Sequence, residues 1–203
     1  MKINPLIVMI LFSLAAVARG QQTQPKIVAE GGGVDDYGST RVLYWNTQTD
    51  SAGGQFAINY GRPAWKKDYE DTAKFDSLTM GKIYRLGSNF WTSLDTCLPL
   101  KISGKKVAAG LYYLGLRRSA EGSKWSLAFI DPAGVRSTHL DAFQIQKATV
   151  KFEATMSEGK AGAKAERLTI TLSYPKESPK QVTLRVAWGN LALEAPIEVT
   201  LAD

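Results

Sequence analysis

The sequence predicts an all-β fold, either an antiparallel β-sandwich or a partly closed barrel, with a short helical turn in one loop. Apolar and polar side chains alternate along four segments of the C-terminal third, and turn residues separate these segments. The segments are also rich in β-branched and aromatic residues. Period-two alternation with one apolar face is typical of a sheet buried on one side, and short connections favour antiparallel neighbours.

Residues 1–20 have the pattern of a secretory signal peptide. Lys2 supplies a positive charge, Leu6–Ala18 is an apolar run of about 13 residues, and Ala18 and Gly20 offer small residues for cleavage. Because a membrane-spanning helix needs roughly 20 apolar residues, an uncleaved anchor is the weaker alternative. We therefore expect an exported protein, periplasmic or extracellular, with no transmembrane segment in the mature chain.

The mature chain divides into a flexible segment at residues 21–40, polar and Gly-rich, and a single β-rich domain at residues 41–203. Strands are expected first at residues 41–46 and 55–60, because both stretches are rich in β-branched and aromatic side chains. The charged stretch 64–81 is expected to be a loop with the helical turn. The remaining strands are expected at residues 82–86, 90–103, 110–118, 124–130, 148–156, 167–174, 181–188 and 196–201.

Charge and residue counts argue against several classes of function. Without residues 1–20 the net charge is 23 − 19 = +4, and the basic residues form scattered pairs such as Lys66-Lys67. Nucleic-acid binding usually needs a clustered basic face, so no nucleic-acid partner is expected. With one histidine and one cysteine in the chain, we expect no metal site and no cofactor.

A hydrolase acting on an envelope polymer or glycan is the enzymatic alternative. It would depend on His139, the single histidine, with Asp141 as its partner in an acid–base pair. No G-x-S-x-G serine motif accompanies them, and an exposed loop histidine without catalytic duty is the simpler interpretation. No catalytic residue is therefore assigned.

Four segments resemble a bacterial family of exported domains, domain of unknown function 2911. They are "YGRP" from Tyr60, "GKIYRLGSN" from Gly81, "GKKVAAGLYYL" from Gly104, and the terminal run "ERLTITL…VTLRVAW…APIEVTL". The chain departs from the family pattern where Tyr84 replaces Trp and Ala108 replaces Pro, and it lacks a Gly-Arg pair near residues 66–67. The resemblance implies an exported β-rich domain and assigns no catalytic residues.

Within "GKIYRLGSNFW", Arg85 is the one cationic side chain among aromatic and aliphatic neighbours. A covered guanidinium needs oxygen partners, because an unpaired buried charge is costly. Arg85 and Asn89 therefore either tie their loop to the "YGRP" segment or line a ligand pocket with Tyr60 and Arg62.

The ligand of such a pocket would be anionic or polyhydroxylated. The function favoured by the sequence is thus non-catalytic binding of a ligand or a partner in the envelope. A structural or adhesion module is the remaining alternative, and it would expose a broad apolar face or a free sheet edge.

Overall fold

The computed structural model describes residues 29, 31–160 and 162–201, and the folded unit begins at Val34. The predicted signal peptide, residues 1–20, lies outside the described residues, as does most of the predicted flexible segment. The first strand begins at Tyr37, before the expected start at Arg41. Asp35 and Asp36 just ahead of it already bind side chains of the domain.

The described residues form strands joined by a few short helical segments. The first strands are β1 (Tyr37–Asn46), β2 (Ser51–Gly61), β3 (Ile83–Arg85), β4 (Ser93–Thr96), β5 (Leu100–Ile102) and β6 (Lys105–Val107). They are followed by β7 (Gly110–Arg118), β8 (Trp125–Ile130), β9 (Val150–Glu158), β10 (Ala165–Ser173), β11 (Gln181–Gly189) and β12 (Leu191–Val199). The helical segments are η1 (Lys67–Glu70), α1 (Thr72–Thr79), α2 (Pro132–Ser137) and η2 (Ala142–Lys147).

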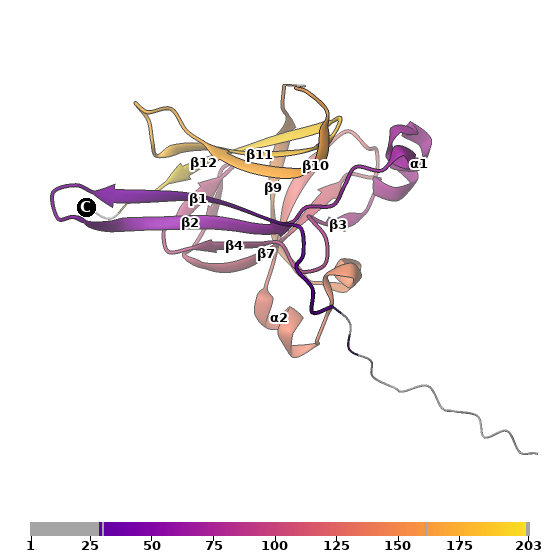
Figure 1. Cartoon of the computed structure of the whole chain (residues 1–203), viewed down its shortest axis with the longest axis horizontal. Coiled ribbons are helices and arrows are strands. Elements are labelled where there is room, and N and C mark those ends of the chain that lie inside the picture. Colours follow the sequence, from indigo (N-terminus) through magenta and orange to yellow (C-terminus); the bar gives the residue numbers. More distant parts are fainter. Residues whose placement is uncertain (1–28, 30, 161, 202–203) are drawn as a thin grey trace, which may run out of the picture. The chain divides into compact units, whose positions relative to one another are not determined.

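The pairs of described strands are all antiparallel and belong to one sheet, whose main path runs β1-β2-β4-β7-β8-β9-β12-β11-β10. Off this path, β3 pairs with β7, and β5 pairs with β12 and β6. Because the described residues form one large antiparallel sheet, the predicted all-β antiparallel fold is confirmed. The sheet is not closed into a barrel. In Figure 1, β10, β11 and β12 lie together above β1 and β2, with α1 beside one end of the strands.

The main core lies between the two halves of this sheet. Its fully buried side chains come from strands throughout this order, for example Phe56 of β2, Phe129 of β8 and Leu184 of β11. Burying a large apolar side chain contributes about 1.5–3 kcal/mol, so this core supplies the main stabilising free energy. A second, smaller cluster, which includes Ile130 and Ile145, forms where α2 and η2 pack on the other face of the sheet.

The predicted alternation holds along most of the C-terminal strands and fails at Val150 and at Tyr174, which is exposed. Val182, Leu184 and Val186 are all buried, as expected from period two. Val150, however, packs in the second cluster with Ile130, whereas Phe152 packs against the main core. The register shifts between Phe129 and Ile130, and such a β-bulge turns the following side chains to the opposite face.

The helices are short and start at local caps. The Asp71 carboxylate accepts from the Lys74 N–H at the start of α1, and Asp131 accepts from the Ala133 N–H at the start of α2. The sequence pattern predicted one helical turn in the 64–81 loop but not α2 or η2. No helix within the described ranges is long and apolar enough to cross a membrane.

The free edge of β10 is covered by the segment that leaves β2. The Ile170 N–H donates to the Tyr60 hydroxyl at 2.9 Å, and this hydroxyl donates to the Ile170 carbonyl at 3.2 Å. Farther along, Trp65 N–H donates to the Glu166 carbonyl at 2.7 Å, and Leu168 N–H donates to the Pro63 carbonyl at 3.0 Å. We call these contacts of residues 60–65 with β10 the β10 bridge.

Replacing Tyr60 with Phe should lower the free energy of unfolding by about 1–3 kcal/mol, because both backbone groups of Ile170 would lose their partner in a buried place. Urea denaturation measures the loss. Tyr69→Phe is the matched control, since the Tyr69 hydroxyl makes no hydrogen bond among the described residues, and it should change stability by under about 0.5 kcal/mol. Equal losses in the two variants would contradict this role of Tyr60.

Candidate functional site

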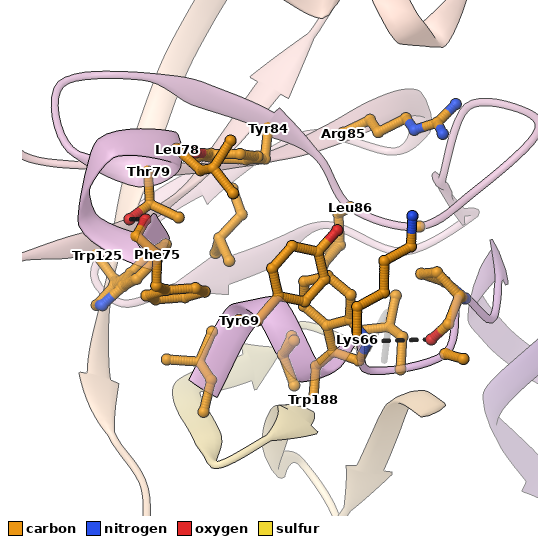
Figure 2. Close-up of a pocket in the computed structure, with 17 residues that line it drawn as sticks. Lys66, Tyr69, Phe75, Leu78, Thr79, Tyr84, Arg85, Leu86, Trp125 and Trp188 are labelled. Atoms are coloured by element: carbon orange, nitrogen blue, oxygen red, sulfur yellow. Dashed lines mark hydrogen bonds between the residues drawn. The ribbon is translucent and has the colours of Figure 1, made fainter. Parts of the chain in front are cut away.

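A cavity of about 280 Å³ lies at one end of the sheet, beneath the segment that joins β2 to β3. It is lined by side chains from this segment and from strands on both sides of the core (Figure 2). Exposed Lys66 and Leu78 are among the lining residues, so the cavity opens to solvent. The full lining is Pro63, Ala64, Lys66, Tyr69, Phe75, Leu78, Thr79, Tyr84, Arg85, Leu86, Gly87, Leu116, Trp125, Leu168, Val186, Trp188 and Leu191.

Tyr69 and Trp188 line one wall of this cavity, and both pack against Trp65, which the β10 bridge holds in place. The Trp65 ring centroid lies 5.1 Å from that of Trp188 and 5.3 Å from that of Tyr69. The Trp188 indole N–H donates to the Pro63 carbonyl at 2.9 Å. Gly189, with φ of +59°, lets the Trp65 ring lie against the backbone, because a Cβ there would stand 2.1 Å from the ring.

The opposite wall comes from α1, which an arginine holds in place. The Arg118 guanidinium donates to Asp76 Oδ1 at 2.6 Å and to Thr79 Oγ1 at 2.8 Å. It also lies over the rings of Phe75 and Trp125, at 5.7 and 5.3 Å from their centroids. These contacts fix α1, and with it Phe75 and Thr79, against the sheet.

The Tyr84 hydroxyl is a buried polar atom beside this largely apolar cavity. Tyr84 extends from β3 toward α1 (Figure 2), where its hydroxyl is buried beside the Thr79 hydroxyl. Burial raises the pKa of Tyr84 to about 12, although the nearby Arg118 charge acts in the opposite direction. The hydroxyl is therefore protonated at neutral pH and is available as a hydrogen-bond donor.

The charged side chains that line the cavity are both cationic. Lys66 and Arg85 belong to the lining, and it includes no Asp or Glu. Figure 2 shows the Lys66 ammonium on the side of the cavity away from Tyr84, and the Arg85 guanidinium turned away from the aromatic rings. The lining therefore offers no carboxylate that could pair with a cationic ligand.

Of the four residues predicted to bind a ligand, Arg85 lines this cavity and the other three lie elsewhere. Tyr60 belongs to the β10 bridge. The Arg62 Nε–H donates to the Leu168 carbonyl at 3.4 Å, and its guanidinium lies 3.8 Å from Asp36. Asn89, at φ of +67°, donates to Asp35 Oδ1 at 2.7 Å. A common ligand site of the four stays a prediction.

Arg85 has no carboxylate within ion-pair distance among the described residues. Its guanidinium lies instead over the ring of Phe143, 5.7 Å from the centroid, and the Phe143 side chain is 78% exposed. The structural alternative, in which Arg85 ties its loop to the Tyr60–Pro63 segment, has no hydrogen bond within the described ranges to carry it. The link between the two segments comes from Gly61, where a Cβ would stand 2.1 Å from the Ser88 carbonyl oxygen.

The histidine proposed for hydrolysis lies apart from the cavity. His139 is exposed, with φ of +51°, in the turn between α2 and η2. The Asp141 carboxylate caps η2 by accepting from the Phe143 N–H at 2.7 Å, and in the part of the chain that the structure describes it makes no hydrogen bond with His139. Over the same residues, no three His, Cys, Asp or Glu side chains gather closely enough to hold a metal ion.

The comparison with family models decides the family of this chain. The model described as "Protein of unknown function (DUF2911)" matches residues 45–197, which include the β10 bridge and the whole cavity. The chain belongs to the DUF2911 family. The predicted resemblance is thereby confirmed. No curated protein and no solved structure matches this DUF2911 chain.

Several cavity residues of this DUF2911 domain were not singled out from the sequence. Trp125 and Trp188 lie in the strands predicted at residues 124–130 and 181–188, and no binding role was assigned to them. Tyr69 and Phe75 lie in the charged stretch expected to be a loop. The available signal was the presence of Trp65, Tyr69 and Phe75 within that charged stretch, because large aromatic side chains are mostly buried and a solvated loop rarely carries three of them.

Replacing Arg85 with Ala should cost less than about 1 kcal/mol of unfolding free energy, because a half-buried cation over an exposed ring contributes little. Arg118→Ala is the comparison, and it should cost about 2–3 kcal/mol because the Arg118 side chain is 15% exposed and bonds Asp76 and Thr79. Denaturant melts of the two variants measure both values. A loss at Arg85 as large as that at Arg118 would show a buried charge partner that the described residues do not supply.

Proposed function

We propose that this DUF2911 domain is an exported, non-catalytic protein that binds a small, mainly apolar molecule in the cavity under residues 63–79. The observation that carries the proposal is the cavity itself. It has a volume of about 280 Å³, is lined mainly by aromatic and aliphatic side chains, and lies at one end of the sheet. Small-molecule sites are typically concave, mainly apolar and supplied with a few polar groups, and the mouths of β-barrels are among their usual places.

The polarity of the lining narrows the kind of ligand. Phe75, Trp125, Trp188 and their aliphatic neighbours offer extended apolar contact. The few polar groups of the lining residues are the buried hydroxyls of Tyr84 and Thr79 and the cationic groups of Lys66 and Arg85. A polyhydroxylated ligand would lose more hydrogen bonds to water than this lining returns, so an apolar molecule fits it better.

The cavity walls are fixed before any ligand arrives. Arg118 fixes α1, and the β10 bridge with Gly189 fixes Trp65 and the adjoining aromatic wall. Binding then requires little ordering of side chains, which lowers its entropic cost. Pre-formed walls with no adjacent acid–base pair are suited to binding and not to hydrolysis.

The neutral fluorescent probe N-phenyl-1-naphthylamine should bind the folded protein and raise its melting temperature, since a ligand specific for the native state stabilises it. Leu191→Trp, which adds bulk to the cavity lining, should weaken probe binding at least tenfold. Leu43→Trp places the same change on β1, outside the cavity lining, and should leave binding unchanged. Fluorescence titration measures all three proteins, and equal probe binding by them would contradict the site.

Export rests on the pattern of residues 1–20, with its charged start, apolar run and small residues at the end. Full-length protein expressed in a Gram-negative host should therefore be recovered outside the cytoplasm, with an intact mass that lacks about 20 residues. Replacing Leu11 and Leu14 with Asp should keep it in the cytoplasm at full length, because the apolar run would be interrupted. Recovery of the unmodified chain at full mass from the cytoplasm would contradict export.

A further inference from the structure

We infer that the ligand of this cavity is an amphipathic carboxylate, whose hydrocarbon body lies inside the cavity and whose charged head group stays at the opening, paired with Arg85 and Lys66. The inference rests on the proposed function and adds to it the chemical class of the ligand. It assigns the two cationic side chains of the lining as the groups that select the head group.

Arg85 is a half-buried arginine that the protein leaves without a carboxylate. Within the described ranges the other half-buried arginines each form an ion pair with an Asp or a Glu; they are Arg62, Arg117, Arg118 and Arg185. Over the same ranges the Arg85 side chain has neither an ion pair nor a hydrogen bond, and its guanidinium lies over the ring of Phe143. A ring offers no oxygen to the five N–H donors of a guanidinium, whose geometry matches a carboxylate. Arg85 therefore keeps the donors that a carboxylate ligand needs.

Lys66 is a second cation of the same lining. Its side chain is exposed and forms no ion pair with any residue that the structure describes. In Figure 2 the charged ends of Lys66 and Arg85 both lie on the side of the cavity away from Phe75 and Thr79 of α1. Because the lining includes no Asp or Glu, an anionic head group on that side meets two cations and no like charge from the lining itself.

The interior of the cavity suits the hydrocarbon body and excludes the head group. Most of the lining side chains are aromatic or aliphatic, and the hydroxyls of Thr79 and Tyr84 are buried beside each other. A carboxylate moved inside would lose its hydration without gaining a partner, which is very costly. At the opening the exposed Lys66 and the outward-turned Arg85 can pair with a head group that keeps part of its water. The arrangement thus favours a molecule with one apolar end and one anionic end.

The volume of the cavity limits the length of the hydrocarbon body. A dry cavity of about 150 Å³ holds benzene, which has six carbon atoms, so about 280 Å³ accommodates roughly ten carbon atoms. The ligand is therefore a small amphiphile and not a long-chain lipid that would need a deeper tunnel. An eight-carbon chain is a suitable probe because it fits this volume with its head group outside.

The test compares octanoate, 1-octanol and octylammonium, which share one chain and differ in charge. Each displaces N-phenyl-1-naphthylamine from wild type, from the double variant Lys66→Gln/Arg85→Gln, and from Lys67→Gln, which removes an exposed lysine outside the lining. In low salt the double variant should bind octanoate at least threefold more weakly than wild type does, because two exposed ion pairs are lost. Its affinity for 1-octanol should be unchanged, and Lys67→Gln should behave as wild type. A smaller loss for octanoate, or an equal loss for 1-octanol, would overturn the inference.

Salt tests the same charge pairing in wild type without any substitution. Raising the ionic strength from about 0.01 M to about 1 M shortens the Debye length from about 30 Å to about 3 Å. The ratio of the octanoate affinity to the 1-octanol affinity should therefore fall in wild type and stay constant in the double variant. A ratio in wild type that does not fall would overturn the inference, even if the double variant failed to fold.

The outcomes distinguish the two proposals. If the three chains bind wild type alike, or if octylammonium binds best, the inference on the ligand fails and the proposed binding function stands. If neither the probe nor any of the three chains binds wild type, or if Leu191→Trp binds them as wild type does, the cavity is not a binding site and both proposals fail.

Discussion

The open edge of β10 is the constraint on which the rest of this structure depends. A sheet that is not closed leaves a row of backbone groups without partners, and such edges must be covered. Here the chain that leaves β2 covers the edge. The Tyr60 hydroxyl forms hydrogen bonds with both backbone groups of Ile170, and the backbone of residues 63–65 forms hydrogen bonds with that of residues 166–168. Because this coverage comes from a connecting segment and not from a full strand, the chain is then free to leave the edge at Lys66 and cross the end of the sheet.

The cavity follows from that path. After the β10 bridge, Trp65 packs against Gly189, and Tyr69 packs against Trp188. On the other side, the hydrogen bond from Arg118 to Asp76 holds α1 against the sheet. Large rigid rings that are held from two sides cannot move into the space between them. The side chains that line such an empty space lose dispersion contacts on that side. The segment therefore covers the edge of the sheet and, by the same path, bounds the cavity at this end of the sheet.

The sequence reveals the strands and the family far better than the site. Alternation placed Leu184 and Val186 correctly because period two depends only on local geometry. The face on which Val150 lies was predicted wrongly, because a β-bulge in the pairing of β9 with β8 turns its side chain to the opposite face of the sheet. The composition of "GKIYRLGSN" drew notice to Arg85, but the adjacent Tyr84 carries the buried hydroxyl. The aromatic wall was not predicted at all. The contact of Trp65 with Trp188 joins residues far apart in the chain, and no local sequence pattern encodes such a contact.

Tyr60, Tyr69 and Tyr84 show how one residue type takes three roles in one domain. The Tyr60 hydroxyl is buried and has two backbone partners, so its contribution is structural. Tyr69 packs its ring against Trp65 and Trp188 and uses no hydroxyl contact among the described residues, so its contribution is shape. The Tyr84 hydroxyl is buried beside the Thr79 hydroxyl, so its contribution is a polar contact between β3 and α1.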